Sequence, residues 1–242
     1  MDIRNGQFLL GDCLQIMPTL PAGSVDMVLC DLPYGTTRNA WDSVLPLDDF
    51  WRETWRLLPE RGPAVLTASQ PFTSALVMSA PREFRYDWVW EKNNPSGHLN
   101  AKTRPLRCHE DILVFGRKSP FYAPQKTSGH PRKTVKSRDG SSSNYGSQKS
   151  SGYSSTDRYP RSVQKVPVVT KGKNQHPTQK PVALFEYLIR TYSEPGAVVL
   201  DMTAGSGTTA IAAERAGRRW LCIERDEGYY WQAVARLLGG DD

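Results

Sequence analysis

The feature that most constrains the fold is the alternation of short apolar runs with stretches of helical spacing. The run at residues 25–30 is apolar at nearly every position, as a strand buried on both faces should be. Leu47, Phe50 and Trp51 begin a helical spacing in the stretch that follows. Because strands that alternate with helices form largely parallel sheets, the sequence predicts an α/β fold with a doubly wound, mostly parallel sheet. The expected strands are 8–10, 25–30, 64–67, 86–90, 111–115, 197–200 and 220–223, and the expected helices are 46–58, 72–79, 182–192, 208–216 and 227–238.

The middle of the chain has a different composition. Residues 117–174 are rich in Ser, Gly, Pro, Lys and Arg, and they hold 13 Lys or Arg residues against Asp139 and Asp157. This segment carries a formal charge of +11, and since the whole chain carries +6, the remainder carries −5. Tyrosines lie among the basic residues, which is typical of a segment that orders against nucleic acid, with cations on phosphates and rings against bases. A disordered linker is the alternative that this composition leaves open.

Composition argues against several classes of protein. No stretch approaches the roughly 20 apolar residues of a membrane span, and the N-terminus lacks the apolar core of a secretory signal. The cysteines, which are Cys13, Cys30, Cys108 and Cys222, form no C-x-x-C pair, and the four histidines lack ligand spacing. We therefore expect reduced, mostly buried thiols, no metal site, no membrane partner and a cytoplasmic location.

A glycine-rich loop indicates a nucleoside-containing cofactor. Residues 201–209 directly follow an expected strand and open an expected helix. Gly205 and Gly207 let the backbone approach a ligand closely, and the helix N-terminus offers unpaired N–H groups. Glu224 ends the next strand, where its carboxylate can accept both hydroxyls of a ribose. The loop also satisfies the dinucleotide pattern G-x-G-x-x-A, so an NAD-dependent dehydrogenase is an alternative, although only one strand and one helix follow the loop.

The end of the expected strand at 25–30 carries a second candidate site. Asp31, Leu32, Pro33 and Tyr34 place a carboxylate, a rigid backbone and an aromatic ring at the mouth of that strand. Such groups can hold the amino group of a flat ring, but similar residues are also common where a strand passes into a turn. These four residues alone fit both interpretations.

Three motifs in one order resemble the β group of DNA amino-methyltransferases. Asp31-Leu32-Pro33-Tyr34 is similar to the D-P-P-Y motif of that family, and residues 176–181 match its H-P-T-Q-K-P segment. Residues 201–208 resemble its D-x-F-x-G-x-G-T loop. The D-P-P-Y-like motif comes first, a basic insert second, H-P-T-Q-K-P third and the glycine-rich loop last, which is the permuted order of the β group. The resemblance spans the chain on both sides of the insert and leaves the insert's own sequence unexplained.

The resemblance implies a site-specific methyltransferase that moves a methyl group from S-adenosylmethionine to N6 of an adenine flipped out of double-stranded DNA. Tyr34 would stack on the base, while Asp31 and a backbone carbonyl of the motif would accept the two amino hydrogens. Lys180 would be suited to the carboxylate of the cofactor. The implied catalytic residues are Asp31, Leu32, Pro33 and Tyr34, and the implied cofactor-binding residues are Asp12, Cys13, His176, Thr178, Lys180, Asp201, Thr203, Ala204, Gly205, Ser206, Gly207, Thr208 and Glu224.

Two positions depart from the family's pattern. Leu32 replaces the first Pro of D-P-P-Y, which keeps a carbonyl but lowers the rigidity of the loop, and Thr203 stands where Phe is common. Asp at position 31, rather than Ser, favours adenine N6 over cytosine N4 by analogy with the family. Several alternatives remain on the same fold. The methyl acceptor could be cytosine N4, RNA or a protein amide, or the protein could bind DNA without turnover.

The resemblance also implies an organisation for the chain. We expect one permuted catalytic domain, with a catalytic half at 1–116, a target-recognition insert at 117–174 and a cofactor-binding half at 175–242. Enzymes of this group occur in the restriction–modification systems of bacteria and phages and are often dimers, so a homodimer is a further expectation.

Overall fold

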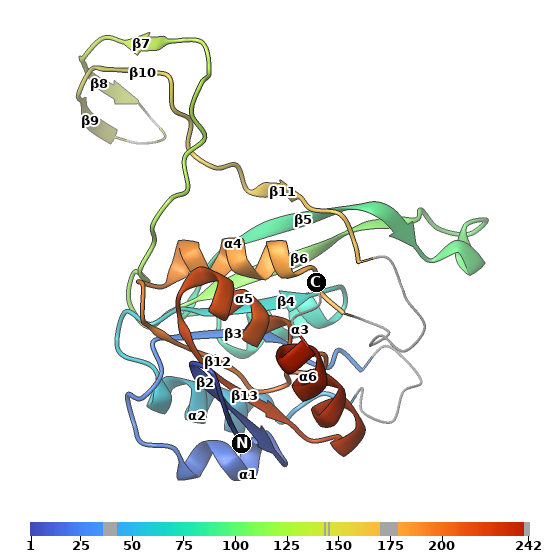
Figure 1. Cartoon of the computed structure of the whole chain (residues 1–242). Coiled ribbons are helices and arrows are strands. Elements are labelled where there is room, and N and C mark those ends of the chain that lie inside the picture. Colours follow the sequence, from blue (N-terminus) through green and yellow to red (C-terminus); the bar gives the residue numbers. More distant parts are fainter. Residues whose placement is uncertain (36–42, 143, 145, 170–178, 240–242) are drawn as a thin grey trace. The chain divides into compact units, whose positions relative to one another are not determined.

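The structure is a computed structural model that describes residues 1–35, 43–142, 144, 146–169 and 179–239 (Figure 1). The chain divides into two compact units. We call Met1–Ala123 together with Ser162–Asp242 the core unit, and Pro124–Arg161 the insert unit. His176 and Thr178, which the sequence assigns to the cofactor site, lie outside the described residues.

The core unit contains a nine-stranded sheet with the order β1-β2-β13-β12-β3-β4-β6-β5-β11. Neighbouring strands are parallel from β2 to β4 in this order, and β11 is parallel to β5. Three pairs are antiparallel: β1 with β2, β4 with β6, and β5 with β6. This arrangement confirms the mostly parallel α/β fold expected from the sequence. The strands are β1 (Asp2–Ile3), β2 (Gly6–Leu10), β3 (Met27–Asp31), β4 (Ala64–Ala68), β5 (Phe84–Ser96), β6 (Arg107–Phe115), β11 (Val163–Lys165), β12 (Val198–Asp201) and β13 (Arg219–Glu224).

Helices cover both faces of the sheet, because alternate residues of its strands point to opposite sides. On β3, Met27 and Leu29 pack in the cluster that contains α4, α5 and α6, while Val28 and Cys30 pack in the cluster that contains α1, α2 and α3 (Figure 1). A strand buried on both faces explains the continuous apolar run in its sequence. The helices are α1 (Cys13–Ile16), α2 (Leu47–Leu57), α3 (Phe72–Ser79), α4 (Val182–Tyr192), α5 (Thr208–Ala216) and α6 (Glu227–Gly239), with 3-10 helices η1 (Met17–Thr19) and η2 (His98–Asn100).

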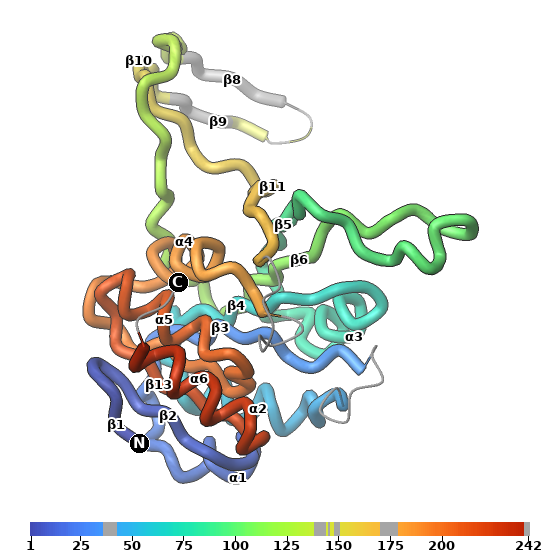
Figure 2. Tube along the Cα trace, turned by 45° about the vertical axis from the view of Figure 1, so that its right-hand side comes forward, coloured from blue at the N-terminus to red at the C-terminus, as the bar shows by residue number. Residues whose placement is uncertain are grey.

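The strands β5 and β6 are longer than the sequence predicts. The expected strands at 86–90 and 111–115 make up only part of β5 and β6. The pairing continues to Glu91 opposite His109 and, after a register shift, resumes with Ser96 opposite Arg107. Figures 1 and 2 show these strands extending out of the sheet as an arm that ends at η2. A strand that leaves the core no longer needs apolar residues, so hydrophobic runs do not mark its far end.

The insert unit has a separate architecture. β7 (Lys133–Val135) pairs antiparallel with β10 (Tyr153–Ser155), and β8 (Arg138–Ser142) pairs antiparallel with β9 (Gly146–Ser150). None of the residues whose burial the structure describes in this unit is buried. The unit is narrower than the expected insert of 117–174, since the described residues on either side of it belong to the core unit and β11 extends the main sheet.

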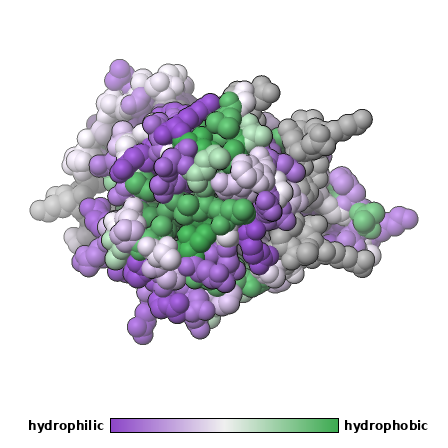
Figure 3. All heavy atoms as spheres, turned by 60° about the horizontal axis from the view of Figure 1, so that its bottom comes forward, coloured by the Kyte–Doolittle hydropathy of each residue, from purple (hydrophilic) through white to green (hydrophobic). Residues whose placement is uncertain are grey.

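Other expectations from composition can also be compared with the structure. Cys13, Cys30 and Cys222 are buried, Cys108 is exposed, and all four thiols are free, as the sequence predicts. Among the helices of the described residues, none is long and apolar enough to cross a bilayer. Figure 3 shows one face on which hydrophobic residues gather among hydrophilic ones. Patches of this kind occur on monomers as well as at interfaces, so the homodimer stays a prediction.

Candidate active site

The two candidate sites of the sequence meet at one edge of the sheet. β12 and β3 are parallel neighbours, with Leu200 opposite Val28, so the loops that follow both strands lie side by side. A cavity of about 1060 Å³ lies at this edge. Of the expected site residues, it is lined by Asp12, Cys13, Asp31, Leu32, Pro33, Tyr34, Lys180, Asp201, Thr203, Ala204, Gly205, Ser206, Thr208 and Glu224. Gly207 is not part of the lining, although it lies in the same loop.

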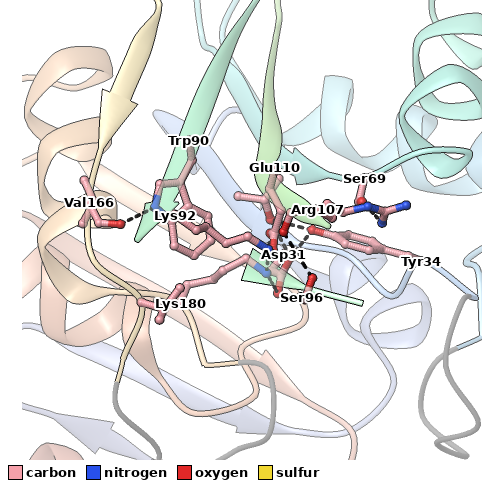
Figure 4. Close-up of polar contacts among 12 residues, drawn as sticks. Asp31, Tyr34, Ser69, Trp90, Lys92, Ser96, Arg107, Glu110, Val166 and Lys180 are labelled. Atoms are coloured by element: carbon pink, nitrogen blue, oxygen red, sulfur yellow. Dashed lines mark hydrogen bonds and ion pairs between the residues drawn. The ribbon is translucent and has the colours of Figure 1, made fainter. Parts of the chain in front are cut away.

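Asp31, the last residue of β3, is held by three donors (Figure 4). The Tyr34 hydroxyl donates to Asp31 Oδ1 over 2.7 Å, and the Thr67 hydroxyl donates to the same oxygen. The Lys180 ammonium group lies 2.6 Å from Asp31 Oδ2. Because a carboxylate offers about four acceptor positions, these three contacts leave room for one further donor on Oδ2.

A chain of alternating charges extends from Asp31 into the site. Lys180 Nζ also lies 3.3 Å from Glu110 Oε2, and Lys92 Nζ lies 3.1 Å from Glu110 Oε1 (Figure 4). Burial favours the neutral form of each group, but the opposite charges outweigh it: the pKa of Glu110 is lowered and the pKa of Lys180 is raised. Glu110 and Lys180 therefore stay ionised, and the formal charges of the two carboxylates and two ammonium groups of the cluster sum to zero.

Tyr34 is fixed by its ring and by its hydroxyl group. The ring stacks on Phe72, with centroids 5.4 Å apart and an angle of 22° between the planes. Burial, followed by the negative charge of Asp31, raises the pKa of Tyr34 well above its ordinary value. The phenol therefore remains a donor, and its hydrogen bond keeps the Asp31 carboxylate in one orientation.

The glycine-rich loop is tied to the end of β13 and to α6. Glu224 Oε2 accepts a hydrogen bond from the backbone N–H of Gly205 over 2.7 Å, and Glu224 Oε1 accepts one from Asp226 over 2.8 Å. Gly207 caps α5 with φ at 72°, and a Cβ there would lie 3.1 Å from Cβ of Ala233 in α6. A residue larger than glycine would therefore strain the backbone and crowd the helix.

Asp201 holds the start of the same loop from inside the core. It is only 3% exposed, and its carboxylate accepts hydrogen bonds from the Thr203 N–H at 3.1 Å and from the Thr209 hydroxyl. Burial raises the pKa of Asp201 to about 6. Asp201 therefore fixes the conformation of the loop through its hydrogen bonds to Thr203 and Thr209. It also lines the cavity.

Two contacts join the glycine-rich loop to the strand that carries Asp31. The Thr203 hydroxyl donates to the backbone oxygen of Asp31 over 3.1 Å, which a Phe at this position could not do. The Thr208 hydroxyl donates to the backbone oxygen of Lys180 over 3.3 Å, while the side chain of Lys180 reaches Asp31. Lys180 and Thr203 thus connect the two candidate sites into one.

The remaining expected residues have mainly local contacts. Leu32 is 2% exposed and packs in the cluster that contains α2 and α3, so its side chain anchors the motif in the core. Asp12 caps α1, because its Oδ1 accepts a hydrogen bond from the N–H of Leu14 over 2.8 Å. Burial raises the pKa of Cys13 to about 11. The binding roles assigned to these residues stay predictions.

Sequence reasoning missed Thr67, Lys92 and Glu110. Thr67 is the one polar residue of β4, and Glu110 lies two residues before the apolar stretch at 112–115 of β6, where a charged residue close to a core strand was a usable signal. Lys92 lies beyond the apolar part of β5 and carried no such signal. The Lys180 ammonium group contacts the carboxylates of Asp31 and Glu110 in the structure, and its expected role at the cofactor carboxylate stays a prediction.

Comparison with known proteins agrees with this fold and identifies the family. A family model described as "DNA methylase", for N6 and N4 methyltransferases, matches residues 25–235. The chain belongs to this family, which confirms the resemblance to DNA amino-methyltransferases. It is also 27% identical, over 265 residues, to the type II methyltransferase M.HinfI of Haemophilus influenzae, with 95% of this chain and 67% of the relative covered.

Solved structures with the same fold include two methyltransferases. The complex of M1.HpyAVI with S-adenosylmethionine has a TM-score of 0.66 and 22% identity, covering 96% of this chain and 99% of the other. The cytosine-N4-specific PvuII DNA methyltransferase has a TM-score of 0.69 and 17% identity, covering 98% and 94%. At these identities the likeness shows the fold.

Proposed function

We propose that this DNA methylase transfers a methyl group from S-adenosylmethionine to N6 of adenine in double-stranded DNA. The observation that carries the proposal is the single cavity in which the glycine-rich loop meets Asp31 and Tyr34. One end of the cavity is suited to a nucleoside, and the other end to a flat ring with an amino group. Family membership argues against the NAD-dependent dehydrogenase that the glycine pattern alone left open.

The cavity fits a cofactor and a base together. Its volume of about 1060 Å³ exceeds what one small ligand needs, since ligand pockets usually measure about 300–1,000 Å³. Glu224 and Asp12 line the end where the glycine-rich loop lies, and carboxylates there can accept ribose hydroxyls or ring donors. S-adenosylmethionine, when bound, supplies the methyl group as an electrophile, and the M1.HpyAVI structure contains this molecule in the same fold.

Asp31 would hold and polarise the target amino group. The remaining acceptor position on Asp31 Oδ2 can take one amino hydrogen, while a backbone carbonyl of residues 31–34 takes the other. Two acceptors draw the nitrogen toward tetrahedral geometry and direct its lone pair at the methyl donor. The carboxylate then stabilises the positive charge that develops on nitrogen. The Tyr34 ring, which lines the cavity and is backed by Phe72, would stack on the base.

Glu110 would keep this arrangement electrostatically favourable. A lone Lys180 beside Asp31 would oppose a developing positive charge on the substrate nitrogen. Glu110, 3.3 Å from the same ammonium group, offsets the charge of Lys180, and Lys92 in turn balances Glu110. The cluster thus fixes the Asp31 carboxylate without adding net positive charge at the reacting nitrogen. In this scheme Glu110 and Lys92 are positioning residues.

We assign binding of the DNA backbone and target recognition to the insert unit. Pro124–Arg161 contains eight Lys or Arg residues and two Asp residues, a formal charge of +6. Such a density of cations attracts phosphates, and its exposed tyrosines can pack on sugars or bases. Lys126 lies 4.5 Å from the ring centroid of Tyr159, so cations and rings already alternate on this unit.

Product analysis tests the proposal. Purified protein is incubated with duplex DNA and methyl-labelled S-adenosylmethionine, and the digested nucleosides are separated. The expected product is N6-methyladenine, with the label abolished by Asp31→Ala. Label in N4-methylcytosine would show that the cytosine chemistry named for the PvuII enzyme applies here. No label with any DNA would overturn the proposal, and so would label that appears only when RNA is supplied in place of DNA. Long-read sequencing of DNA from cells that express the chain would map the recognition sequence.

A further inference from the structure

The arm formed by β5 and β6 ends in a leucine that the proposed chemistry does not use. Leu99, in η2, is 101% exposed, the largest exposed fraction among the large hydrophobic residues that the structure describes. Its neighbours on the arm, residues 93–109, are mostly polar or basic. A single fully exposed leucine on a projecting element suggests a contact with another molecule.

The arm is held in place at its base. Ser96 on β5 pairs with Arg107 on β6, and the Arg107 guanidinium donates to the Ser69 hydroxyl and to the backbone oxygen of Gln70 (Figure 4). Gly97 then reverses the chain with φ at 93°, in a region that favours glycine. The position of η2 is therefore set by strand pairing and by the loop after β4.

The wall of the cavity continues along this arm. Its lining includes every residue from Asn93 to His98, and Leu99 is the next residue in the chain. The tip of the arm consequently lies at the rim of the cavity that would receive the target base. A duplex that presents a base to Asp31 and Tyr34 would bring its neighbouring base pairs to this rim.

The charge of the arm matches a nucleic acid. Lys102, Arg104 and Arg107 lie between residues 93 and 109, and this range contains no Asp or Glu. Lys102 and Arg104 are exposed on the turn that follows η2. Cations beside an exposed apolar residue are the combination by which proteins hold phosphates and place a wedge between bases.

We propose that Leu99 enters the duplex next to the target base and fills the space that the base leaves when it flips out. This inference rests on the proposed function and adds the element that drives flipping. Removing a base from the stack leaves an apolar gap, and an inserted side chain both occupies that gap and blocks return of the base. Lys102 and Arg104 would hold the flanking phosphates.

The test compares Leu99→Ala with two matched variants. Leu99→Met keeps an apolar wedge, and Leu238→Ala removes a leucine that is 62% exposed on α6. The substrate is a duplex with the mapped recognition sequence, with 2-aminopurine at the target position for fluorescence and adenine there for methylation. We expect Leu99→Ala to lower kcat/KM about tenfold and to reduce the fluorescence increase, while both other variants stay within about twofold of the unmodified protein.

A second substrate separates a wedge from a general contact. When an abasic site lies opposite the target base, the target base has no pairing to break and no partner base draws it back into the stack. We expect the defect of Leu99→Ala to shrink to about twofold or less on this duplex. Equal activity of Leu99→Ala and Leu238→Ala on the fully paired duplex would overturn the inference while leaving the proposed function intact. Absence of methylation by the unmodified protein would instead remove the proposed function itself.

Discussion

The core unit and the insert unit differ in charge and in packing. The insert unit carries eight basic and two acidic residues, so its +6 equals the formal charge of the whole chain, and the core unit holds 23 of each sign. The core unit contains every buried hydrophobic residue that the structure describes. The packed core that stabilises the fold and the net positive charge of the chain therefore lie in different units.

This division means that substitutions can separate the two proposed tasks of the protein, which are methyl transfer and DNA binding. A site that positions a carboxylate within a few tenths of an ångström needs a packed core behind it. A surface that holds phosphates needs cations and exposure, and it tolerates loose packing. Changes in the core unit should therefore alter turnover and stability, and changes in the insert unit should alter DNA affinity.

The largest effect is expected from Asp31→Asn. The amide keeps the size of the side chain but removes the charge that stabilises the reacting nitrogen, so we expect kcat to fall by about 100-fold or more. The measurement is single-turnover methylation of duplex DNA, with DNA affinity recorded alongside. Asp48→Asn, at an exposed position of α2, is the control. A large loss of DNA affinity in Asp31→Asn would contradict the separation of tasks.

Glu110→Gln tests the charge cluster. The change leaves Lys92 without its counter-charge and Lys180 with Asp31 alone. Breaking a buried pair in this way costs about 3–5 kcal/mol of unfolding free energy. Because the pKa of Glu110 is lowered in the folded state, its contribution to stability is present above its ordinary pKa and is lost as the pH falls below it. Denaturant unfolding at several pH values measures both effects.

The control for Glu110→Gln is Glu60→Gln. Glu60 forms an exposed ion pair with Lys118 at 2.7 Å, so its loss should change the unfolding free energy by about 0.5 kcal/mol or less. An equal loss of unfolding free energy in the two variants would show that the buried charge cluster stabilises the protein no more than an exposed ion pair does. We also expect Glu110→Gln to lower kcat, because Lys180 would lose its ion pair with Glu110 and its position beside Asp31 would no longer be fixed.

Asp201→Asn tests the pH dependence of the core unit. Burial raises the pKa of Asp201 from about 3.8 to about 6, so the folded protein binds this proton more tightly than the unfolded chain does. The unfolding free energy that Asp201 contributes should fall by about 3 kcal/mol at most as the pH rises from 4 to 6. It should stay constant above pH 6. The unfolding free energy of the unmodified protein minus that of Asp201→Asn should follow this decline. A difference that is flat or rises with pH would contradict the shift.

The smallest expected effect is in the insert unit. Replacing Lys133 and Lys136 by Gln removes two exposed charges, and the slope of log affinity against log salt should decrease by about 1.8 if both contact phosphates. The unfolding free energy should change by about 0.5 kcal/mol or less. Lys118→Gln, at an exposed position of the core unit, is the control for affinity. An unchanged slope would remove the insert unit from the DNA interface.

Much of the fold could be predicted because the core repeats simple patterns. The helices at 72–79, 182–192 and 208–216 have the predicted ends, since prolines or glycines lie beside them and apolar faces run through them. The far ends of β5 and β6 and the strands of the insert unit were missed. They are polar and exposed, and no hydrophobic period marks a strand that does not pack on a core.

The sequence by itself determined the fold class, the family and the position of the two motif loops, because local periodicity and motif order are written along the chain. Only the tertiary structure decided what holds Asp31. Lys180 is 149 positions away from Asp31, and Thr203 is 172 positions away, yet both make contact with it. They meet because β12 lies beside β3 and because Lys180 is anchored at the start of α5. Contacts between such distant residues depend on strand order and side-chain packing, which no local pattern in the sequence specifies.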